Sequence, residues 1–406
     1  MKAAVRSAFL ASFALALAFA FAIAIASCAE IAGVRRLSLD GPDGGHAAPP
    51  DVMIETDARS CVDVATDPLN CGICGHDCLG GTCAAGKCMP VELAFVESGG
   101  AAIAVDATDV YWSITKDSLG GVVRAVPKRG GEPRDIAARA NIRTLATDDG
   151  ALYMGSSSET AAVERCPQAD CGRGAIVAFG SGAVLDLQIH GTDAFWRSPS
   201  GIERAPKLRV NGGRPIIVAQ FPSGHRSNGF AVDDTGAYWT DAQNGTILRC
   251  PLTGCTPPVE DGGVVVIAPD DGGVAPDDGG VTPDDGGATI IAARDNAFAL
   301  ALGTNELFWT VNGPAGAIFR LNLGDGSATP LASDGHNPQS VLLDSKRIYW
   351  LTTEALSDRT IMACAREGKC EPLTLATSHD PPIGVAQDAT ALYWVTLGGH
   401  VQRLAK

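Results

Sequence analysis

Seven copies of one short pattern constrain this fold more than any other feature of the sequence. Each copy is a short apolar run, a turn around Asp or Gly, and an aromatic or apolar pair, as in "FAVDDTGAYWTD" at residues 230–241. Self-similarity at a fixed period is typical of repeat architectures. The second residues of the pairs, here called marker residues, lie 42, 42, 43, 70, 41 and 44 residues apart: Trp112, Met154, Trp196, Trp239, Trp309, Trp350 and Trp394.

The length of the repeat predicts its internal structure. Short β-branched and aromatic runs between turn residues indicate strands, and four strands in ~42 residues is the spacing of one propeller blade. A single blade cannot bury both of its faces, so neighbouring copies must pack against one another around an axis. We therefore predict an all-β protein in which residues 89–406 form a seven-bladed β-propeller.

The two ends of the repeat region predict how the ring closes. The seventh copy stops after its third strand, in "GGHVQRLAK" at residues 398–406. Immediately before the first copy, "CMPVELA" at residues 88–94 parallels "CEPLTLA" at residues 370–376, the fourth strand of the sixth copy. The N-terminal strand is therefore predicted to complete the last blade, because closure removes exposed sheet edges.

The one long interval contains an acidic insertion, residues 256–287. Its "APDDGGVAPDDGGVTPDDGG" repeats a seven-residue unit three times, and no Lys or Arg occurs from Cys250 to Ala293. Paired carboxylates suit calcium, but this spacing fits neither an EF-hand loop nor the nine-residue calcium repeat. We predict a solvated, disordered loop.

The N-terminus has the charge and length of an export signal. Lys2 and Arg6 precede residues 8–26, which are apolar apart from one serine. A run of this length also suits a permanent membrane anchor. The residues that follow the run decide between these two interpretations.

"IASC" at residues 25–28 resembles the lipobox of bacterial lipoproteins. That resemblance implies a signal peptide at residues 1–27, cleavage before Cys28, and acylation of the Cys28 sulfur and amino group. Several acyl chains on one residue would hold the protein on a membrane. Residues 28–60 have little apolar periodicity and are predicted to be a flexible tether. The expected location is the bacterial cell envelope, at the outer membrane.

Cysteine usage also favours an exported, oxidised protein, because assigning Cys28 to lipid leaves twelve of thirteen. Three tight pairs flank turns in the repeats and are predicted to be hairpin-spanning disulfides: Cys166 with Cys171, Cys250 with Cys255, and Cys364 with Cys370. Six more form a cysteine-rich module at residues 61–88: Cys61, Cys71, Cys74, Cys78, Cys83 and Cys88. Three disulfides of open connectivity are predicted there, with zinc on the single CxxC as the alternative.

Two families resemble parts of this chain. The module's "NCGICGHDCLGGTCAAGKC" resembles short cysteine-rich segments of exported myxobacterial proteins. The repeats of residues 89–406 resemble the YWTD propellers of the low-density lipoprotein receptor family and the related NHL propellers, and residues 238–241 match the YWTD motif letter for letter. YWTD propellers usually have six blades, whereas seven copies are counted here. The resemblance implies binding or scaffolding more often than catalysis.

Charge excludes one class of partner. The chain has a net charge of -15, and removing residues 1–27 removes two basic residues and no acidic ones. An acidic surface repels phosphate backbones, so no nucleic-acid partner is expected. Sequences typical of serine hydrolases, zinc proteases, dinucleotide-binding proteins and P-loop proteins do not occur.

Two sets of residues are candidates for a site. In the turns between first and second strands, an acidic residue stands six positions before most markers, and the residues at this position are Asp106, Asp148, His190, Asp233, Gly303, Asp344 and Asp388. A cation site is one interpretation of these acids. We favour the other, in which Asp caps its turn by accepting backbone N–H groups.

Four histidines are predicted to lie around the other end of the ring. His225, His336 and His379 occupy equivalent blade-to-blade loops, and His400 is in a second-to-third turn on the same face. Neutral imidazoles there would bind a transition metal, and protonated ones an anion; exposed loop histidines without a ligand are the alternative.

These features favour a membrane-anchored binding or scaffolding module for an envelope protein or glycan over an enzyme. The alternative is a metal-dependent lyase or hydrolase that uses His225, His336 and His379. This arrangement resembles some NHL-type lyases, which use histidines at the channel mouth to bind metal. No cofactor is predicted for the binding module, whereas the enzyme would need a divalent metal.

Overall fold

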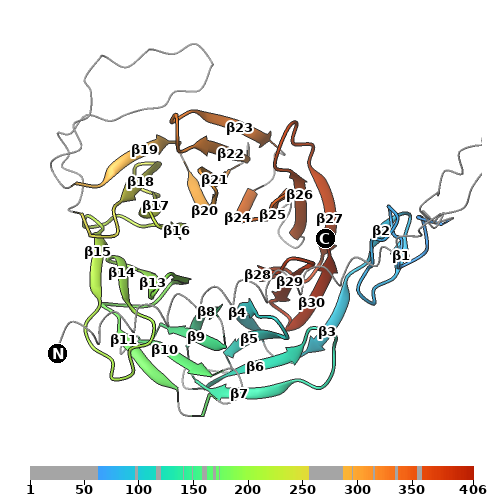
Figure 1. Cartoon of the computed structure of the whole chain (residues 1–406), viewed down its shortest axis with the longest axis horizontal. Coiled ribbons are helices and arrows are strands. Elements are labelled where there is room, and N and C mark those ends of the chain that lie inside the picture. Colours follow the sequence, from blue (N-terminus) through green and yellow to red (C-terminus); the bar gives the residue numbers. More distant parts are fainter. Residues whose placement is uncertain are drawn as a thin grey trace, which may run out of the picture. The chain divides into compact units, whose positions relative to one another are not determined.

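Every regular element that the structure describes is a β-strand. The structure is a computed structural model that describes residues 63–96, 99–115, 120–139, 141–148, 150–157, 162–167, 171–172, 174–255, 287–294, 296–313, 316–333, 337–353 and 359–406. All of these residues belong to one compact unit, Ser60–Lys406. They form one two-stranded and seven four-stranded antiparallel sheets, and the seven larger sheets are arranged in a ring (Figure 1).

Each four-stranded sheet is one blade. Blades one to three comprise β4 (Gly100–Val105), β5 (Asp109–Thr115), β6 (Gly121–Pro127) and β7 (Arg134–Ala138); β8 (Ile142–Asp148), β9 (Ala151–Ser156), β10 (Ala162–Pro167) and β11 (Ala175–Phe179); and β12 (Asp186–His190), β13 (Asp193–Ser198), β14 (Gly201–Pro206) and β15 (Ile216–Gln220).

Blades four to six continue the same order. They comprise β16 (Phe230–Val232), β17 (Ala237–Asp241), β18 (Thr246–Cys250) and β19 (Thr289–Ala293); β20 (Ala297–Gly303), β21 (Glu306–Val311), β22 (Ala317–Asn322) and β23 (Ala328–Ser333); and β24 (Asn337–Leu343), β25 (Arg347–Thr353), β26 (Arg359–Ala365) and β27 (Leu373–Ser378).

The seventh blade joins the two ends of the repeat region. Its strands are β28 (Pro382–Gln387), β29 (Ala391–Thr396), β30 (His400–Ala405) and the N-terminal β3 (Val91–Phe95). β3 pairs antiparallel with β30, with Val91 opposite Arg403. The predicted seven-bladed fold and its closure by the N-terminal strand are therefore confirmed.

A bulge shows that β3 is a true fourth strand. In all seven blades, one β-bulge interrupts the register between the third and fourth strands. In blade seven this bulge lies between Glu92 and Ala94. Bulges increase strand twist locally, so every outer strand bends in the same way. The strand from the chain's beginning repeats the geometry of the other six.

The second strand of each blade forms the core. Its marker residue points to one face and the preceding residue to the other, and both are buried because neighbouring blades cover both faces. Trp112, Trp196 and Trp309 are 0% exposed, and Met154 replaces the tryptophan in blade two at 0%. The aromatic pair that defines the sequence repeat is thus the packing contact between blades.

The two ends of the ring carry different connections. One end carries the first-to-second and third-to-fourth turns and all three propeller disulfides, Cys166–Cys171, Cys250–Cys255 and Cys364–Cys370. We call it the disulfide face. The other end carries the second-to-third turns and the blade-to-blade connections, and we call it the channel-mouth face. The three predicted hairpin disulfides are confirmed.

Each of these disulfides packs on the preceding blade. The Cys255 amide donates to the carbonyl of Val218 in β15 at 3.0 Å, which joins blade four to blade three. Cys166 and Cys171 share a buried cluster with Ala137 of blade one, and the pair in blade six shares one with Ala332 of blade five. The disulfides therefore hold loops against neighbouring outer strands.

The cysteine-rich module takes the corresponding place on blade seven. Cys71 is bonded to Cys83 and Cys78 to Cys88, around the short hairpin of β1 (Cys83–Ala84) and β2 (Lys87–Cys88). Cys74 is also disulfide-bonded, and Cys61 lies outside the described residues. These buried cysteines pack beside Leu375 and Ala376 of β27, the outer strand of blade six.

Several expectations concern segments outside the described residues. These are the signal peptide, Cys28, the tether of residues 28–60, and residues 256–286 of the acidic insertion. In the part of the chain that the structure describes, no helix has the length and apolarity needed to cross a membrane.

Candidate functional site: the channel mouth

A central channel runs through the ring. A cavity of about 410 Å³ follows it and is lined by residues of the first strand, or of the segment just before it, in all seven blades. Gln188 of β12 lies on this wall and donates to the Phe230 carbonyl of the next blade at 2.8 Å. Arg143, Asp186 and Gln339 also line it, so the channel interior presents polar and charged groups as well as apolar side chains.

The channel widens into a larger cavity on the channel-mouth face. This mouth cavity has a volume of about 900 Å³ and is lined mainly by blades two to four. Three arginines reach it: Arg143 at the start of β8, Arg197 on β13, and Arg226 in the connection between β15 and β16. None of the described residues that line it is Asp or Glu.

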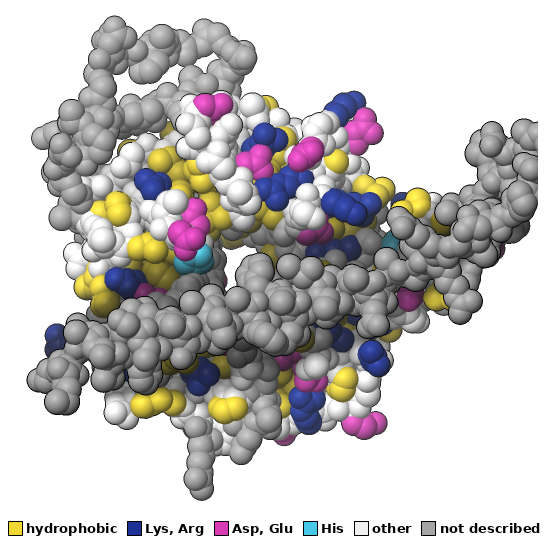
Figure 2. Space-filling model, in the orientation of Figure 1, with side chains coloured by type: hydrophobic (Ala, Val, Ile, Leu, Met, Phe, Trp, Pro, Cys, Tyr) yellow, Lys and Arg dark blue, Asp and Glu magenta, His cyan; other side chains and the backbone are white. Residues whose placement is uncertain are grey.

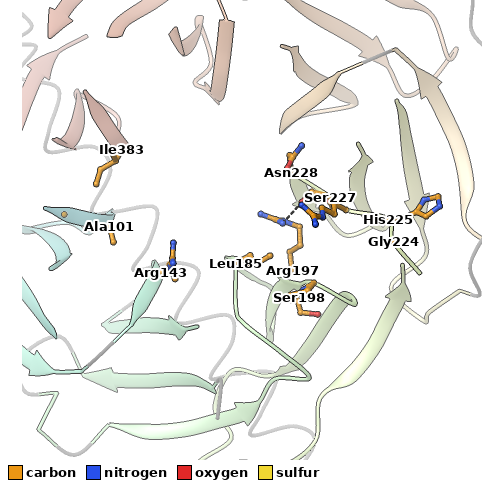
Figure 3. A pocket seen from close by; sticks show the side chains of 13 residues that line it. Ala101, Arg143, Leu185, Arg197, Ser198, Gly224, His225, Ser227, Asn228 and Ile383 are labelled. Carbon is orange, nitrogen blue, oxygen red and sulfur yellow. Dashed lines mark hydrogen bonds between the residues drawn. The ribbon is translucent and has the colours of Figure 1, made fainter. Parts of the chain in front are cut away.

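Arg197 is the most firmly held of the three. Its guanidinium donates to the Ser227 carbonyl at 2.5 Å, as Figure 3 shows, and its buried Nε has no partner among the described residues. Burial lowers the pKa of Arg197, whereas the charge of Asp186 acts to raise it. Burial in turn raises the pKa of Asp186, opposed by Arg197 and by the Leu187 amide. Asp186 lies deeper, on the channel wall directly opposite Arg197 in the sheet.

Arg143 and Arg226 are exposed to solvent. The Nε of Arg143 lies 3.3 Å from the Ser157 hydroxyl. Neither side chain has an ion pair within the described ranges. Together with Arg197 they bring three guanidinium groups to the cavity. A guanidinium carries several N–H donors and binds carboxylate or phosphate in a bidentate manner. Their position at a concave opening suits an anion.

The YWTD copy in blade four supports one wall of this cavity. Tyr238 and Trp239 are buried, and the Thr240 hydroxyl accepts the amides of Asn228 and Gly229. Asp241 accepts the Gln243 amide and pairs with Nδ1 of His225 at 2.7 Å. The motif therefore fixes the loop that carries Arg226 and His225.

The described candidate histidines lie on the channel-mouth face but do not gather at one point. His225 lines the cavity, yet its ring is directed away from the opening in Figure 3 and contacts Asp241. His400 begins β30, pairs with Glu92 at 2.6 Å and packs on Phe95 at a ring distance of 4.7 Å. His379 lies in the connection between β27 and β28, and His336 is outside the described residues.

No described histidine belongs to a group arranged for metal binding. Over the described ranges, one group of three or more His, Cys, Asp or Glu ligand atoms lies within 4.8 Å, and it consists of Cys71, Cys78 and Cys88. All three are disulfide-bonded. His225 and His400 instead each have a carboxylate partner of their own.

The Asp that stands six residues before the marker in most blades has a structural role. Asp106 accepts the amides of Thr108 and Asp109, and its other oxygen accepts the Tyr111 hydroxyl at 2.8 Å. Asp233, Asp344 and Asp388 make the same contacts in their own blades. The turn-capping interpretation is confirmed for these residues. Where His190 replaces Asp, it pairs with Asp234 at 2.8 Å.

Comparison with known proteins supports the fold and no more. No family model matches the sequence. No curated protein matches it either. Virginiamycin B lyase from Staphylococcus aureus is similar in structure, with a TM-score of 0.57 and 12% identity over 78% of this chain and 98% of that chain.

Two further structures show the same likeness. The WD40 β-propeller domain of Doa1 has a TM-score of 0.53 and 11% identity over 78% of this chain and 95% of that one. A chain of the mitotic checkpoint complex has a TM-score of 0.52 and 12% identity over 78% and 94%. The chain is thus a seven-bladed β-propeller with a basic cavity at one end of its channel.

Sequence reasoning missed the three arginines. The distance of a loop residue from the marker predicts which face it lies on, for basic residues as for histidines. Arg197 directly follows marker Trp196, and Arg226 directly follows His225. Applying the same count to basic residues would have placed both on the channel-mouth face.

Proposed function

We propose that this chain is a binding propeller of the cell envelope whose channel mouth receives an acidic group of a partner protein. One observation carries the proposal: Arg143, Arg197 and Arg226 line a cavity of about 900 Å³ that has no acidic residue among its described lining. The chain as a whole has a net charge of -15. The mouth is therefore a basic site on an acidic protein.

Electrostatics make this arrangement selective. Acidic and basic side chains are interspersed over the face shown in Figure 2. A cleft lined by one sign of charge focuses the field and raises the local concentration of oppositely charged ligands. An acidic partner would be repelled by the overall charge and attracted at the mouth, so the mouth would set both the docking position and the orientation.

A protein is the partner that we favour. Propellers commonly present loops to protein partners, and one structural neighbour is a chain of the mitotic checkpoint complex. The channel-mouth face offers loops from every blade around a concave centre, which suits a projecting acidic loop. Glycan carboxylates share the same chemistry, and the test below separates the two.

The location in the envelope is part of the proposal. It rests on the lipobox-like "IASC" at residues 25–28, with Cys28 as the lipid attachment residue, and on residues 28–60 as a tether. Five described disulfides support an oxidising compartment, because such bonds are rare in the cytosol. We also propose kinship with the YWTD and NHL propellers, supported by the roles of residues 238–241 in blade four.

The binding proposal can be tested with soluble protein and charged probes. We expect a hexaglutamate peptide to bind residues 60–406 at low salt and a hexalysine peptide not to bind there. Arg143→Glu with Arg226→Glu should weaken hexaglutamate binding by roughly tenfold or more, because two attractive contacts become repulsive. The matched control is Arg214→Glu, an exposed arginine in the loop between β14 and β15 on the disulfide face.

A pull-down from envelope extract then identifies the natural partner. The wild-type protein and the Arg214→Glu control should capture the same protein, and the double mouth variant should lose it. A glycan would be assigned instead if glycosidase treatment of the extract abolished capture and protease treatment of the extract did not. Equal hexaglutamate affinity for all three proteins would refute the mouth as the site.

The alternative function is a metal-dependent lyase or hydrolase. One observation favours it, the likeness in structure to virginiamycin B lyase. Metal analysis of purified protein, with and without His225→Ala, His336→Ala and His379→Ala, tests this alternative. Stoichiometric metal that the triple variant loses, together with turnover of a small substrate, would favour the enzyme.

A further inference from the structure

Ion pairs join neighbouring blades on the disulfide face. The residue after the third strand is basic in four blades, and its side chain reaches an acidic residue of the preceding blade. These pairs are Lys128 with Asp388 at 2.6 Å, Lys207 with Asp148 at 3.1 Å, Lys406 with Asp344 at 3.2 Å, and Arg366 with Glu306 at 2.8 Å. The contact recurs because the blades repeat the same geometry.

Blade five has a leucine at this position. The amide of the residue after the third strand donates to the carbonyl that precedes the second strand, as Lys128 does to Thr108 and Lys207 to Thr192. Leu323 makes the same bond to Asn305 at 3.0 Å, so it stands where the lysines stand. At this position, therefore, blade five has no basic side chain to pair with an acidic residue of blade four.

A pocket lies where that cation would be. It has a volume of about 470 Å³ and lies between blades four and five, on the disulfide face. Asp233, Thr235, Tyr238 and Arg249 line it from blade four. The Arg249 guanidinium donates to the Tyr238 hydroxyl and to the Thr235 carbonyl. Leu321 and Leu323 of blade five and Ile290 of β19 supply apolar walls. A carboxylate at one end and aliphatic walls beside it match the two parts of an alkylammonium group.

Blades two and four share a trio of Asp, Tyr and Arg, and in blade two a further cation pairs with the Asp. There Tyr153 donates to Asp148, Arg165 donates to the Tyr153 hydroxyl, and Lys207 pairs with Asp148. The arginine also lies over the tyrosine ring, 5.9 Å from its centroid. A basic side chain beside the tyrosine is thus compatible with a second cation at the carboxylate.

Blade four repeats the trio without the second cation. Tyr238 lies 3.4 Å from one Asp233 oxygen, and Arg249 donates to the Tyr238 hydroxyl at 3.2 Å and lies 5.8 Å from its ring centroid. The other Asp233 oxygen caps the turn through Thr235 and Gly236. No Lys or Arg among the described residues forms an ion pair with Asp233. Its Oδ2 therefore keeps acceptor capacity toward the pocket.

We propose that the pocket between blades four and five binds an alkylammonium group, which takes the place of the lysine that joins other blades. The ammonium donates to Asp233 Oδ2, and the alkyl chain lies along Leu321, Leu323 and Ile290. The group belongs to a free polyamine or to a lysine side chain of a partner protein. This site is on the face opposite the channel mouth and does not depend on the function proposed there.

The experiment measures binding of 1,5-diaminopentane, N-acetyl-lysine amide and neutral 1-pentanol to residues 60–406 by isothermal titration. We expect both amines to bind and 1-pentanol not to bind. Leu323→Lys supplies the missing cation from the chain itself, so it should weaken amine binding by roughly tenfold and raise the Tm. Asp233→Asn should weaken binding similarly, while its Oδ1 still caps the turn.

Two further variants control for indirect effects. Glu132→Gln changes an exposed carboxylate of the same face, in the turn between β6 and β7 of blade one, and should leave binding unchanged. Lys207→Leu copies the blade-five sequence into blade three and should create a second amine site beside Asp148, which raises the stoichiometry from one to two. Binding that Leu323→Lys and Asp233→Asn leave intact, or 1-pentanol binding equal to the amines, would overturn the proposal. Tighter binding of N-acetyl-lysine amide than of 1,5-diaminopentane assigns a protein partner, and the reverse order assigns a polyamine; both support the site.

Discussion

The two faces of the ring use charged side chains in opposite ways. On the disulfide face, charged groups are bonded to one another: Asp388 accepts two amides and the Tyr393 hydroxyl and pairs with Lys128. On the channel-mouth face, Arg143 and Arg226 are exposed and form no ion pair with described residues. The acidic turns of the disulfide face are satisfied within the fold, whereas the mouth cavity of the other face keeps two arginines available to a ligand.

This difference separates residues that stabilise from residues that bind. A buried or half-buried polar group costs free energy unless it is paired, so satisfied groups are evidence of structure. Unpaired cations at a concave opening contribute little to folding and remain able to bind an anion. The pocket at Asp233 is the exception on the disulfide face, because its carboxylate has the turn contacts of the other blades but not their cation.

The largest effect on stability is expected from Asp388→Ala. The change removes the partner of Lys128, the Tyr393 hydroxyl and two backbone amides at the interface that closes the ring. We expect a loss of about 3 kcal/mol in the free energy of unfolding, measured in urea. Asp388→Asn, which can still cap the turn, should lose less. Equal stability of Asp388→Ala and wild type would remove the distinction between the faces.

Acid should lower the free energy of unfolding by protonating the paired carboxylates of the disulfide face. Burial acts to raise the pKa of Asp344, but hydrogen bonds from the Lys346 and Arg347 amides, Tyr349 and Lys406 lower it from 3.8 to about 2. A carboxyl whose folded pKa is depressed contributes stability above its unfolded pKa and loses it as pH falls through the folded pKa. Because Asp344 is partly exposed and solvent screens its contacts, this contribution is about 1–2 kcal/mol, lost between roughly pH 4 and pH 2.

The pKa of Asp388 is lowered in the same direction, with burial opposed by Lys128 and by the turn amides. The free energy of unfolding should therefore fall steeply from pH 4 to pH 2. The Asp344→Asn variant should show a shallower fall in this window, because its side chain does not titrate. Parallel pH profiles for this variant and wild type would contradict the assignment.

Removing one propeller disulfide should have a smaller effect. Cys250 and Cys255 are five residues apart and their bond closes a short loop. The Cys255 amide holds that loop on β15 of the preceding blade. Because the closed loop is short, we expect the paired change Cys250→Ala and Cys255→Ser to cost about 1–2 kcal/mol in urea unfolding. A reductant should lower the stability of wild type more than that of the variant. An identical response of both proteins would show that this bond does not stabilise the blade.

The fold could be predicted because its information is local and repeated. An aromatic or apolar pair recurs once in every blade, and the parallel between residues 88–94 and 370–376 predicted the closure. Turn capping by Asp106 and its equivalents follows from the same local chemistry. Disulfides across short turns needed only the spacing of their cysteines. None of these required knowledge of which residues meet across blades.

The site could not be predicted in the same way, since its contacts join residues of different elements. His225 and Asp241 are 16 residues apart and pair only because β17 ends where the preceding loop returns. Arg197 is held by the Ser227 carbonyl of the next blade. The packing of the cysteine-rich module on β27 likewise depends on closure. Equivalent repeat positions fix which face a residue lies on, but not its partner.

The smallest effect on stability is expected at the channel mouth, and it is the sharpest test of the comparison between faces. Arg143→Ala and Arg226→Ala remove exposed side chains without ion pairs, so each should change the free energy of unfolding by less than about 0.5 kcal/mol. The same changes should each weaken hexaglutamate binding and reduce its dependence on salt, because each removes one charge–charge contact that salt screens. Arg124→Ala is the matched control, since its guanidinium pairs with Asp135 at 2.6 Å on the outer part of blade one. A large loss of stability in the mouth variants, with binding unchanged, would place these arginines among the structural residues.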